Sequence, residues 1–324
     1  MTTPNTDIKT LVRRLEKRHQ KKQAATALVA GTAVLGLTVL IAPLFMKEEA
    51  AQIVEAPAQV LPVDGPDAYA DFSLEGKAAI VYDLTTGEVL YERNARSQLP
   101  LASLTKLLTV YAAANALQPG STVTMTESAL SAEGESGFGA GESFAFADLA
   151  RLTLVSSSND AAAAIAEAAA TKQALSGKNM LAGAAAAAGL SQTYALNGTG
   201  LDESLSISGG YGSAYDVAKL SGALLEKAPE IAHASVRPSI SIQSLEGVNH
   251  ALPNTNPDIV HIPNVLLSKT GFTDLAGGNL AVVYDAGIGH PVAVVVLGSS
   301  REGRFRDVER LISRTQSHFA GIAH

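Results

Sequence analysis

The chain has no cysteine and no tryptophan among its 324 residues. Without cysteine it has no disulfides, thiolate metal sites, iron–sulfur clusters or thiol nucleophiles. Its seven histidines are scattered, with no H-E-x-x-H motif and no pair spaced four apart. The phosphate-binding loops G-x-G-x-x-G and G-x-x-x-x-G-K-[ST] are also missing. We therefore expect neither a metal ion nor a cofactor.

Bases are outnumbered by acids, 24 to 31, which gives a formal net charge of −7. We expect no nucleic-acid partner, because proteins that bind nucleic acids usually carry an excess of positive charge. The chain is 47% hydrophobic and 17% charged, a composition that can build a large core and that is not typical of disordered proteins.

The charge is unevenly distributed along the chain. Residues 1–23 are basic, and residues 24–46 carry no charge at all. At about 1.5 Å per helical residue this run spans the roughly 30 Å of a bilayer core. Bases before the run and acids after it place the N-terminus in the cytoplasm. We expect one transmembrane anchor at 24–46. A cleaved signal peptide, whose apolar region is usually shorter, and a buried core helix are the alternatives.

The rest of the chain divides into two segments. Residues 47–72 are rich in alanine, proline and acids without helical or strand periodicity, which indicates an extended stalk. Residues 73–324 contain no second linker and are expected to form one domain.

Strand patterns lie at both ends of this domain, with helical patterns between them. We expect strands at 77–83, 88–91, 265–270, 279–284 and 291–297, with the first two forming a hairpin and all five pairing antiparallel in one sheet. We expect helices around 104–114, 149–155, 161–188, 217–225 and 308–319. This order predicts an α+β fold and not a Rossmann alternation.

The first chemical motif is S-x-x-K at Ser103 and Lys106. On a helix these side chains share one face, so the amine can take the serine proton. The motif opens a helix, where free N–H groups favour an anion formed at the serine. The alternative is that Ser103 is a helix cap and Lys106 a surface lysine.

Two later motifs strengthen the first. Ser157-Ser158-Asn159 lies between two helical stretches, and Lys269-Thr270-Gly271 ends an apolar strand, where glycine admits a close approach of backbone or ligand. Each alone could be a cap or a turn. In this order S-x-x-K, S-x-N and K-T-G are the signature of penicillin-binding proteins and class A β-lactamases.

Further blocks carry a closer resemblance. They are D-x-x-T-G-x-V-L-Y-x-x-N-A at 83–95, L-A-S-L-T-K at 101–106, S-N-D-A at 158–161, N-G-T-G-L-D at 197–202 and K-T-G-F-T-D-x-A-G at 269–277. Together they resemble the D-alanyl-D-alanine carboxypeptidases, the low-molecular-mass penicillin-binding proteins. The resemblance implies a β-lactamase-like antiparallel sheet with flanking helices. Ser158 stands where many relatives have glycine, and many relatives also carry C-terminal membrane-binding parts, whose role the N-terminal span would take here.

The resemblance implies a serine peptidase acting on peptidoglycan stem peptides that end in D-Ala-D-Ala, with β-lactams as covalent inhibitors. The implied catalytic residues are Ser103, Lys106 and Ser157, and the implied substrate-binding residues are Asn159, Lys269, Thr270, Gly271, Phe272 and Arg304. Ser103 would be the nucleophile, Lys106 the base and Ser157 the proton relay to the leaving amine.

The remaining implied roles concern substrate binding. Asn159 would bind the peptide backbone, Lys269 and Thr270 the terminal carboxylate, and the N–H groups of Ser103 and Phe272 the oxyanion. A lysine base needs a lowered pKa, from burial or from a nearby cation, for which Lys269 is the candidate. Arg304, in an expected turn after the last strand, is a weaker carboxylate ligand and could equally be solvated.

Several rival functions share this constellation. Class A β-lactamases deacylate with the glutamate of an E-x-x-L-N loop, where this chain has Thr193, so we expect a stable β-lactam adduct. Peptidoglycan DD-endopeptidase or transpeptidase action stays open, as does an inactive peptidoglycan-binding module. We expect the chain in a bacterial cytoplasmic membrane, crossing it once with the catalytic domain outside.

Overall fold

The computed structural model of the protein describes residues 68–70, 72–134 and 137–321. The predicted basic segment 1–23, the predicted anchor 24–46 and most of the predicted stalk 47–72 lie outside the described residues. Among the helices within the described ranges, none combines the length and the apolar character needed to cross a membrane.

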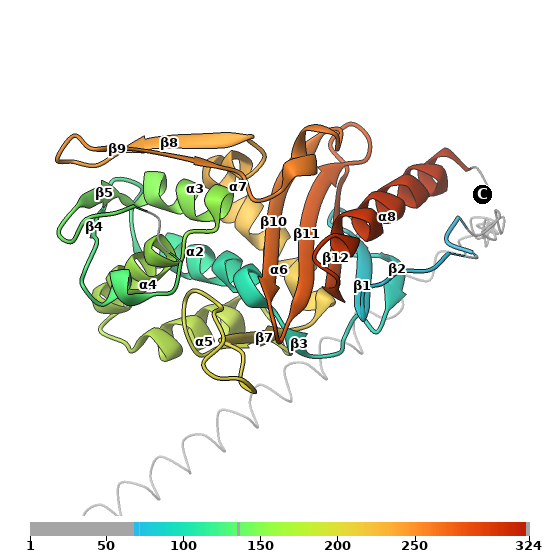
Figure 1. Cartoon of the computed structure of the whole chain (residues 1–324). Coiled ribbons are helices and arrows are strands. Elements are labelled where there is room, and N and C mark those ends of the chain that lie inside the picture. The colour runs from blue at the N-terminus through green and yellow to red at the C-terminus, as the bar shows by residue number, and fades with distance from the viewer. Residues whose placement is uncertain (1–67, 71, 135–136, 322–324) are drawn as a thin grey trace, which may run out of the picture. The chain divides into compact units, whose positions relative to one another are not determined.

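A five-stranded antiparallel sheet joins the two ends of the described chain (Figure 1). Its strands are β1 (Ala78–Asp83), β2 (Val89–Arg93), β10 (Val265–Thr273), β11 (Gly277–Asp285) and β12 (Pro291–Ser299). They are ordered β10-β11-β12-β1-β2, so the early hairpin pairs with the last strand through β1 and β12. The predicted antiparallel pairing of all five strands is confirmed.

Both faces of this sheet are covered. Ile80 and Val295 belong to a core shared with α6 (Ala214–Lys227), whereas Val81 and Val294 face α8 (Gly303–Ala320). Because side chains alternate between faces, strands buried on both sides become continuous apolar runs. That is why these strands could be recognised from sequence.

The remaining elements lie mainly beyond the β10 edge of the sheet (Figure 1). The helices are α2 (Thr105–Ala116), α3 (Phe146–Ser156), α4 (Asn159–Gln173), α5 (Gly177–Ala187) and α7 (Pro229–Ala234), with short 3₁₀ turns η2 (Ala102–Leu104), η3 (Ala129–Ser131) and η4 (Pro257–Val260). The short strands are β3 (Leu99–Pro100), β4 (Thr122–Thr124), β5 (Ser143–Ala145), β6 (Tyr194–Ala195), β7 (Gly210–Gly212), β8 (Ser239–Gln243) and β9 (Asn249–Pro253).

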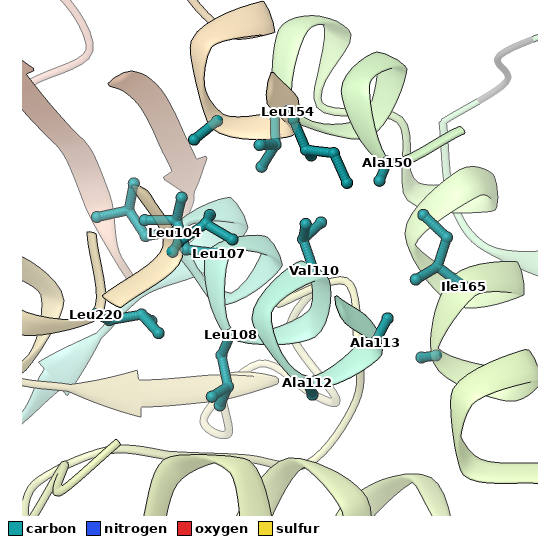
Figure 2. Close-up of a cluster of buried hydrophobic side chains, with 14 of the residues drawn as sticks. Leu104, Leu107, Leu108, Val110, Ala112, Ala113, Ala150, Leu154, Ile165 and Leu220 are labelled. Atoms are coloured by element: carbon teal, nitrogen blue, oxygen red, sulfur yellow. The ribbon is translucent and has the colours of Figure 1, made fainter. Parts of the chain in front are cut away.

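Helix α2 lies inside this group of helices. Figure 2 shows Leu108 and Val110 leaving α2 on opposite sides, with α3, α4 and α6 supplying partners around it. Every residue of α2 from Thr105 to Val110 is buried. Its first turn, which carries Lys106, is therefore enclosed.

The end of the predicted stalk belongs to the domain. Ala68 and Tyr69 are buried, the Tyr69 ring stacks on Tyr91 with centroids 5.3 Å apart, and the Tyr69 hydroxyl donates to Thr315 Oγ1 over 2.9 Å. The predicted boundary at residue 73 is therefore too late. The error arose because one aromatic side chain docks these residues without creating any periodic pattern.

Candidate active site

Ser103 lies in η2, immediately before α2, and is half-buried. No side-chain cap bond is found at the start of η2 or of α2, so the Ser103 hydroxyl is not a helix cap. Ala102 before it has φ 48°, a left-handed conformation disfavoured for residues with a Cβ. Such local strain is common where a side chain must be held for chemistry.

Gly271 on β10 allows the strand to touch this turn. A Cβ at Gly271 would lie 2.9 Å from the carbonyl oxygen of Leu101 and 3.3 Å from the backbone nitrogen of Ser103. The predicted close approach at this glycine is therefore made by the backbone that carries the nucleophile candidate.

Lys106 is fully buried, and its Nζ has three neighbours. Nζ lies 2.9 Å from Ser103 Oγ, 2.7 Å from Asn159 Oδ1 and 2.7 Å from the Thr199 carbonyl. Burial lowers the pKa of Lys106 from 10.5 to about 7. Of the two causes expected above, burial is confirmed, because the first turn of α2 is enclosed, whereas the candidate cation Lys269 is not a cause of this shift.

The three neighbours of Lys106 differ in what they can do. An amide oxygen and a carbonyl oxygen only accept hydrogen bonds, whereas a serine hydroxyl also donates. A neutral amine has two N–H groups and one lone pair, so the N–H groups go to Asn159 and Thr199. The lone pair then faces Ser103 Oγ, the orientation that proton removal from serine requires.

The S-x-N motif bridges two helices. Helix α3 ends at Ser156, Ser157 turns the chain with φ 62°, and α4 begins at Asn159. Ser158 is buried and its Oγ accepts from the N–H of Ala161, so it caps α4. The substitution of glycine by serine at this position is therefore accommodated by a capping role.

Asn159 and Ser157 contact different lysines. Asn159 accepts from Lys106 and donates from Nδ2 to the Glu133 carbonyl over 2.6 Å. Lys269 Nζ, on β10, donates to Ser157 Oγ over 2.8 Å and to the Thr270 carbonyl over 2.9 Å. The structure thus forms two neighbouring groups, Ser103 with Lys106 and Asn159, and Ser157 with Lys269, which the Ser157-Ser158-Asn159 segment connects along the chain.

Lys269 is buried and lies near other positive charges. Burial, and then the charges of Lys106 and Arg304, hold the pKa of Lys269 well below its ordinary value. The Thr270 hydroxyl next to it shares a 2.6 Å hydrogen bond with Thr255 Oγ1. An anion bound here would favour the charged form of Lys269.

Arg304 lies in the first turn of α8 and not in a turn before a helix. It is 8% exposed, so the alternative of a solvated arginine is wrong. Its Nη1 donates to the Gly271 carbonyl over 2.7 Å, and burial lowers its pKa to about 10. Arg304 thereby supports the K-T-G segment. Helix α8 begins at Gly303, five residues before the predicted start, which was too late because the first residues of the helix lack the apolar repeat.

Two contributors were missed by the sequence analysis. Asn279 on β11 is fully buried, donates to the Pro100 carbonyl over 3.0 Å and accepts from the Gly298 N–H over 2.8 Å. It ties the segment before Ser103 to the sheet, and its signal was a polar residue within an apolar strand. Thr199 contributes a backbone carbonyl, which leaves no signal in the side-chain pattern.

Comparison with known proteins places these features in a family. The Peptidase S11 model, described as D-alanyl-D-alanine carboxypeptidase, matches residues 66–301. The D-alanyl-D-alanine carboxypeptidase DacF of Bacillus subtilis is 28% identical over 271 residues, 82% of this chain and 68% of that protein. The D-alanyl-D-alanine endopeptidase of Pseudomonas aeruginosa is 31% identical, covering 74% of this chain and 76% of that protein.

Solved structures show similarity to the same family. Penicillin-binding protein D2 of Listeria monocytogenes, in a cefotaxime-bound form, has 26% identity and a TM-score of 0.63, covering 75% of this chain and 98% of that chain. A D-alanyl-D-alanine carboxypeptidase of Mycobacterium tuberculosis has 26% identity and a TM-score of 0.66, and the match covers 82% of this chain and 95% of that chain. This chain spans about two thirds of the length of the curated carboxypeptidases that it matches. With the match to the family model extending over most of the described domain, the chain belongs to the D-alanyl-D-alanine carboxypeptidase family of serine peptidases.

Proposed function

We propose that this chain is a serine carboxypeptidase that removes the terminal D-alanine from peptidoglycan stem peptides. The observation that carries the proposal is the 2.9 Å contact between Lys106 Nζ and Ser103 Oγ, made by an amine whose other two neighbours can only accept hydrogen bonds. Such an amine is available as a general base near neutral pH.

The reaction begins with acylation of Ser103. Its Oγ bonds to the carbonyl carbon between the two D-alanines while the hydroxyl proton passes to Lys106. The oxyanion is stabilised by the N–H groups of Ser103 and Phe272, on the two segments that meet at Gly271. The C–N bond then breaks as the proton held by Lys106 is delivered to the departing D-alanine amine, with the Ser157 hydroxyl as the proposed relay, which takes up one proton as it passes another on.

Substrate recognition uses the K-T-G strand. The carboxylate of the terminal D-alanine accepts a hydrogen bond from Thr270 Oγ1 and is attracted by the charge of Lys269. Arg304 supports this strand through its hydrogen bond to the Gly271 carbonyl. Asn159 holds the peptide backbone. Since a free carboxylate marks the C-terminus of a peptide, this pair selects a carboxypeptidase substrate.

Water completes the cycle by hydrolysing the acyl-enzyme, and a β-lactam adduct is expected to persist. Thr193, which stands where class A β-lactamases have their deacylating glutamate, is buried and donates to Asp216 Oδ2 over 3.0 Å. Its hydroxyl is thus held by α6 and provides no carboxylate base, which argues against a β-lactamase. An inactive binding module is disfavoured by the complete network around Lys106.

A DD-endopeptidase or transpeptidase is the second candidate, favoured by the similarity to the endopeptidase of Pseudomonas aeruginosa. The test is to incubate the full chain with diacetyl-Lys-D-Ala-D-Ala, with a crosslinked dimeric peptide and with an added amine acceptor. Release of free D-alanine from the first peptide, with diacetyl-Lys-D-Ala as the other product and nothing joined to the amine, supports the carboxypeptidase. Cleavage of the dimer alone, or transfer to the amine, assigns one of the other activities.

We also propose that residues 24–46 anchor the chain in a bacterial cytoplasmic membrane, with residues 1–23 inside and the domain outside. The support is the uncharged run and its basic flank. In cell fractionation the full chain should stay in the membrane pellet after an alkaline carbonate wash. A chain recovered in the wash supernatant would contradict the anchor.

Thr270→Val tests carboxylate recognition. Valine keeps the shape of threonine and removes the hydroxyl, and a hydrogen bond to a charged group contributes about 1.5–3 kcal/mol. We expect KM for the free peptide to rise roughly tenfold or more, with a much smaller effect on the same peptide carrying a C-terminal amide. Steady-state kinetics on both peptides measure this difference. An equal loss on the two peptides would remove Thr270 from carboxylate binding.

A further inference from the structure

Within the N-G-T-G-L-D segment at 197–202, only the Thr199 carbonyl has a role in the reaction proposed above, as a neighbour of the base. Its Thr199 carbonyl accepts the 2.7 Å hydrogen bond from Lys106 Nζ, and this contact is buried. The position of that carbonyl therefore decides where one of the two N–H groups of the neutral amine goes.

The side chain of Asn197 holds this segment together, using both ends of its amide. Its Oδ1 accepts from Thr199 N (3.1 Å), Thr199 Oγ1 (2.9 Å) and Gly200 N (2.7 Å), and its Nδ2 donates to the Leu201 carbonyl (3.0 Å) and to Glu203 Oε1 (2.8 Å). Three of these bonds lie on the two residues that flank the Thr199 carbonyl.

Packing fixes the segment against the catalytic helix. Thr109 Oγ1, one turn after Lys106 on α2, donates to the Gly198 carbonyl over 2.7 Å. Gly200 has φ 78°, and a Cβ there would lie 1.9 Å from the carbonyl oxygen of Ala102, next to Ser103. The segment is thus wedged between the turn that carries Ser103 and the helix that carries Lys106.

We propose that Asn197 is a positioning residue for the general base: by fixing the Thr199 carbonyl it directs the lone pair of Lys106 toward Ser103. This inference rests on the proposed function, in which Lys106 deprotonates Ser103. Without the Asn197 amide the Thr199 carbonyl is free to turn, water gains access to Lys106 Nζ, and the amine is no longer confined to a single orientation.

The test is Asn197→Ala in the full chain, followed by penicillin acylation rates and by D-alanine release from pH 5 to pH 9. We expect kcat and the acylation rate to fall on the order of 10- to 100-fold, as for other losses of alignment, with little change in KM. Hydration of Lys106 should also raise its pKa and move the acidic limb of the profile to higher pH.

Asp285→Ala is the matched control. The Asp285 carboxylate accepts from three backbone N–H groups, those of Gly287, Gly289 and His290, in the turn between β11 and β12. It should change stability without changing kcat or the pH profile. Thr109→Val, which frees the Gly198 carbonyl, provides a second variant if Asn197→Ala does not fold, and it should move the profile in the same direction.

The possible failures are distinguishable. If the wild-type chain neither reacts with penicillin nor releases D-alanine, the proposed function is wrong. If the wild-type chain is active and the folded variant keeps its kcat and its acidic limb, Asn197 does not position the base. A uniform loss at every pH, matched by Asp285→Ala, would likewise overturn the inference.

Discussion

The Ser103→Ala variant should form no covalent adduct with penicillin and should lose D-alanine release by roughly 10⁴-fold or more, as expected when a catalytic nucleophile is removed. Ser103 Oγ contacts Lys106 Nζ and caps no helix, so stability should change by no more than about 1 kcal/mol. Intact-mass spectrometry and a thermal melt measure the two effects.

Ser176→Ala is a suitable control for this variant. Ser176 Oγ accepts from the N–H of Asn179 at the start of α5 and so caps that helix. Losing this cap should cost about 1 kcal/mol while labelling remains complete. A folded Ser103→Ala chain that still takes up penicillin would show that another residue is the nucleophile.

Lys106→Met should lower the acylation rate by about 10²- to 10⁴-fold, the range for loss of a general base. Methionine fits a buried site but leaves Ser103 with no base. In the wild-type chain the rate should fall about tenfold per pH unit below 7, because the pKa of Lys106 is about 7 and its protonated form cannot accept a proton. The variant should lack this acidic limb.

Two further substitutions sharpen the Lys106 experiment. Lys106→Arg keeps the charge but stays protonated at all accessible pH values, so it should be as slow as the methionine variant. Lys219→Met removes a lysine of α6 that donates to the carbonyl of Gly189, which follows α5, and should leave the rate and the profile unchanged. Persistence of the acidic limb near pH 7 in Lys106→Met would assign that titration to another group.

The central strands β1, β11 and β12 were predictable because they are apolar on both faces. The error at β10 is instructive: the predicted strand ended at residue 270, whereas β10 extends to Thr273. Gly271 was interpreted as the end of the strand, whereas it lies inside β10, where its missing Cβ admits the Leu101 carbonyl. The β8–β9 hairpin, which alternates buried and exposed residues over Ser239–Gln243, was not predicted at all.

The candidate site was predictable where motifs carry side-chain chemistry, and less so where the backbone acts. The motifs identified Ser103, Lys106 and Lys269, but the burial of α2 that sets the pKa of Lys106 is a tertiary property. The Thr199 carbonyl could not be found from side-chain patterns. Arg304 was predicted as a carboxylate ligand in a turn, whereas its side chain donates to the Gly271 carbonyl from a helix that begins earlier than expected.

The most direct test of this account is intact-mass spectrometry of the full chain after incubation with penicillin, followed by peptide mapping. The account predicts one penicilloyl group per chain, located on the peptide that contains Ser103 and retained after the free drug is removed. An unmodified chain, an adduct on another residue, or rapid release of hydrolysed penicillin would contradict it.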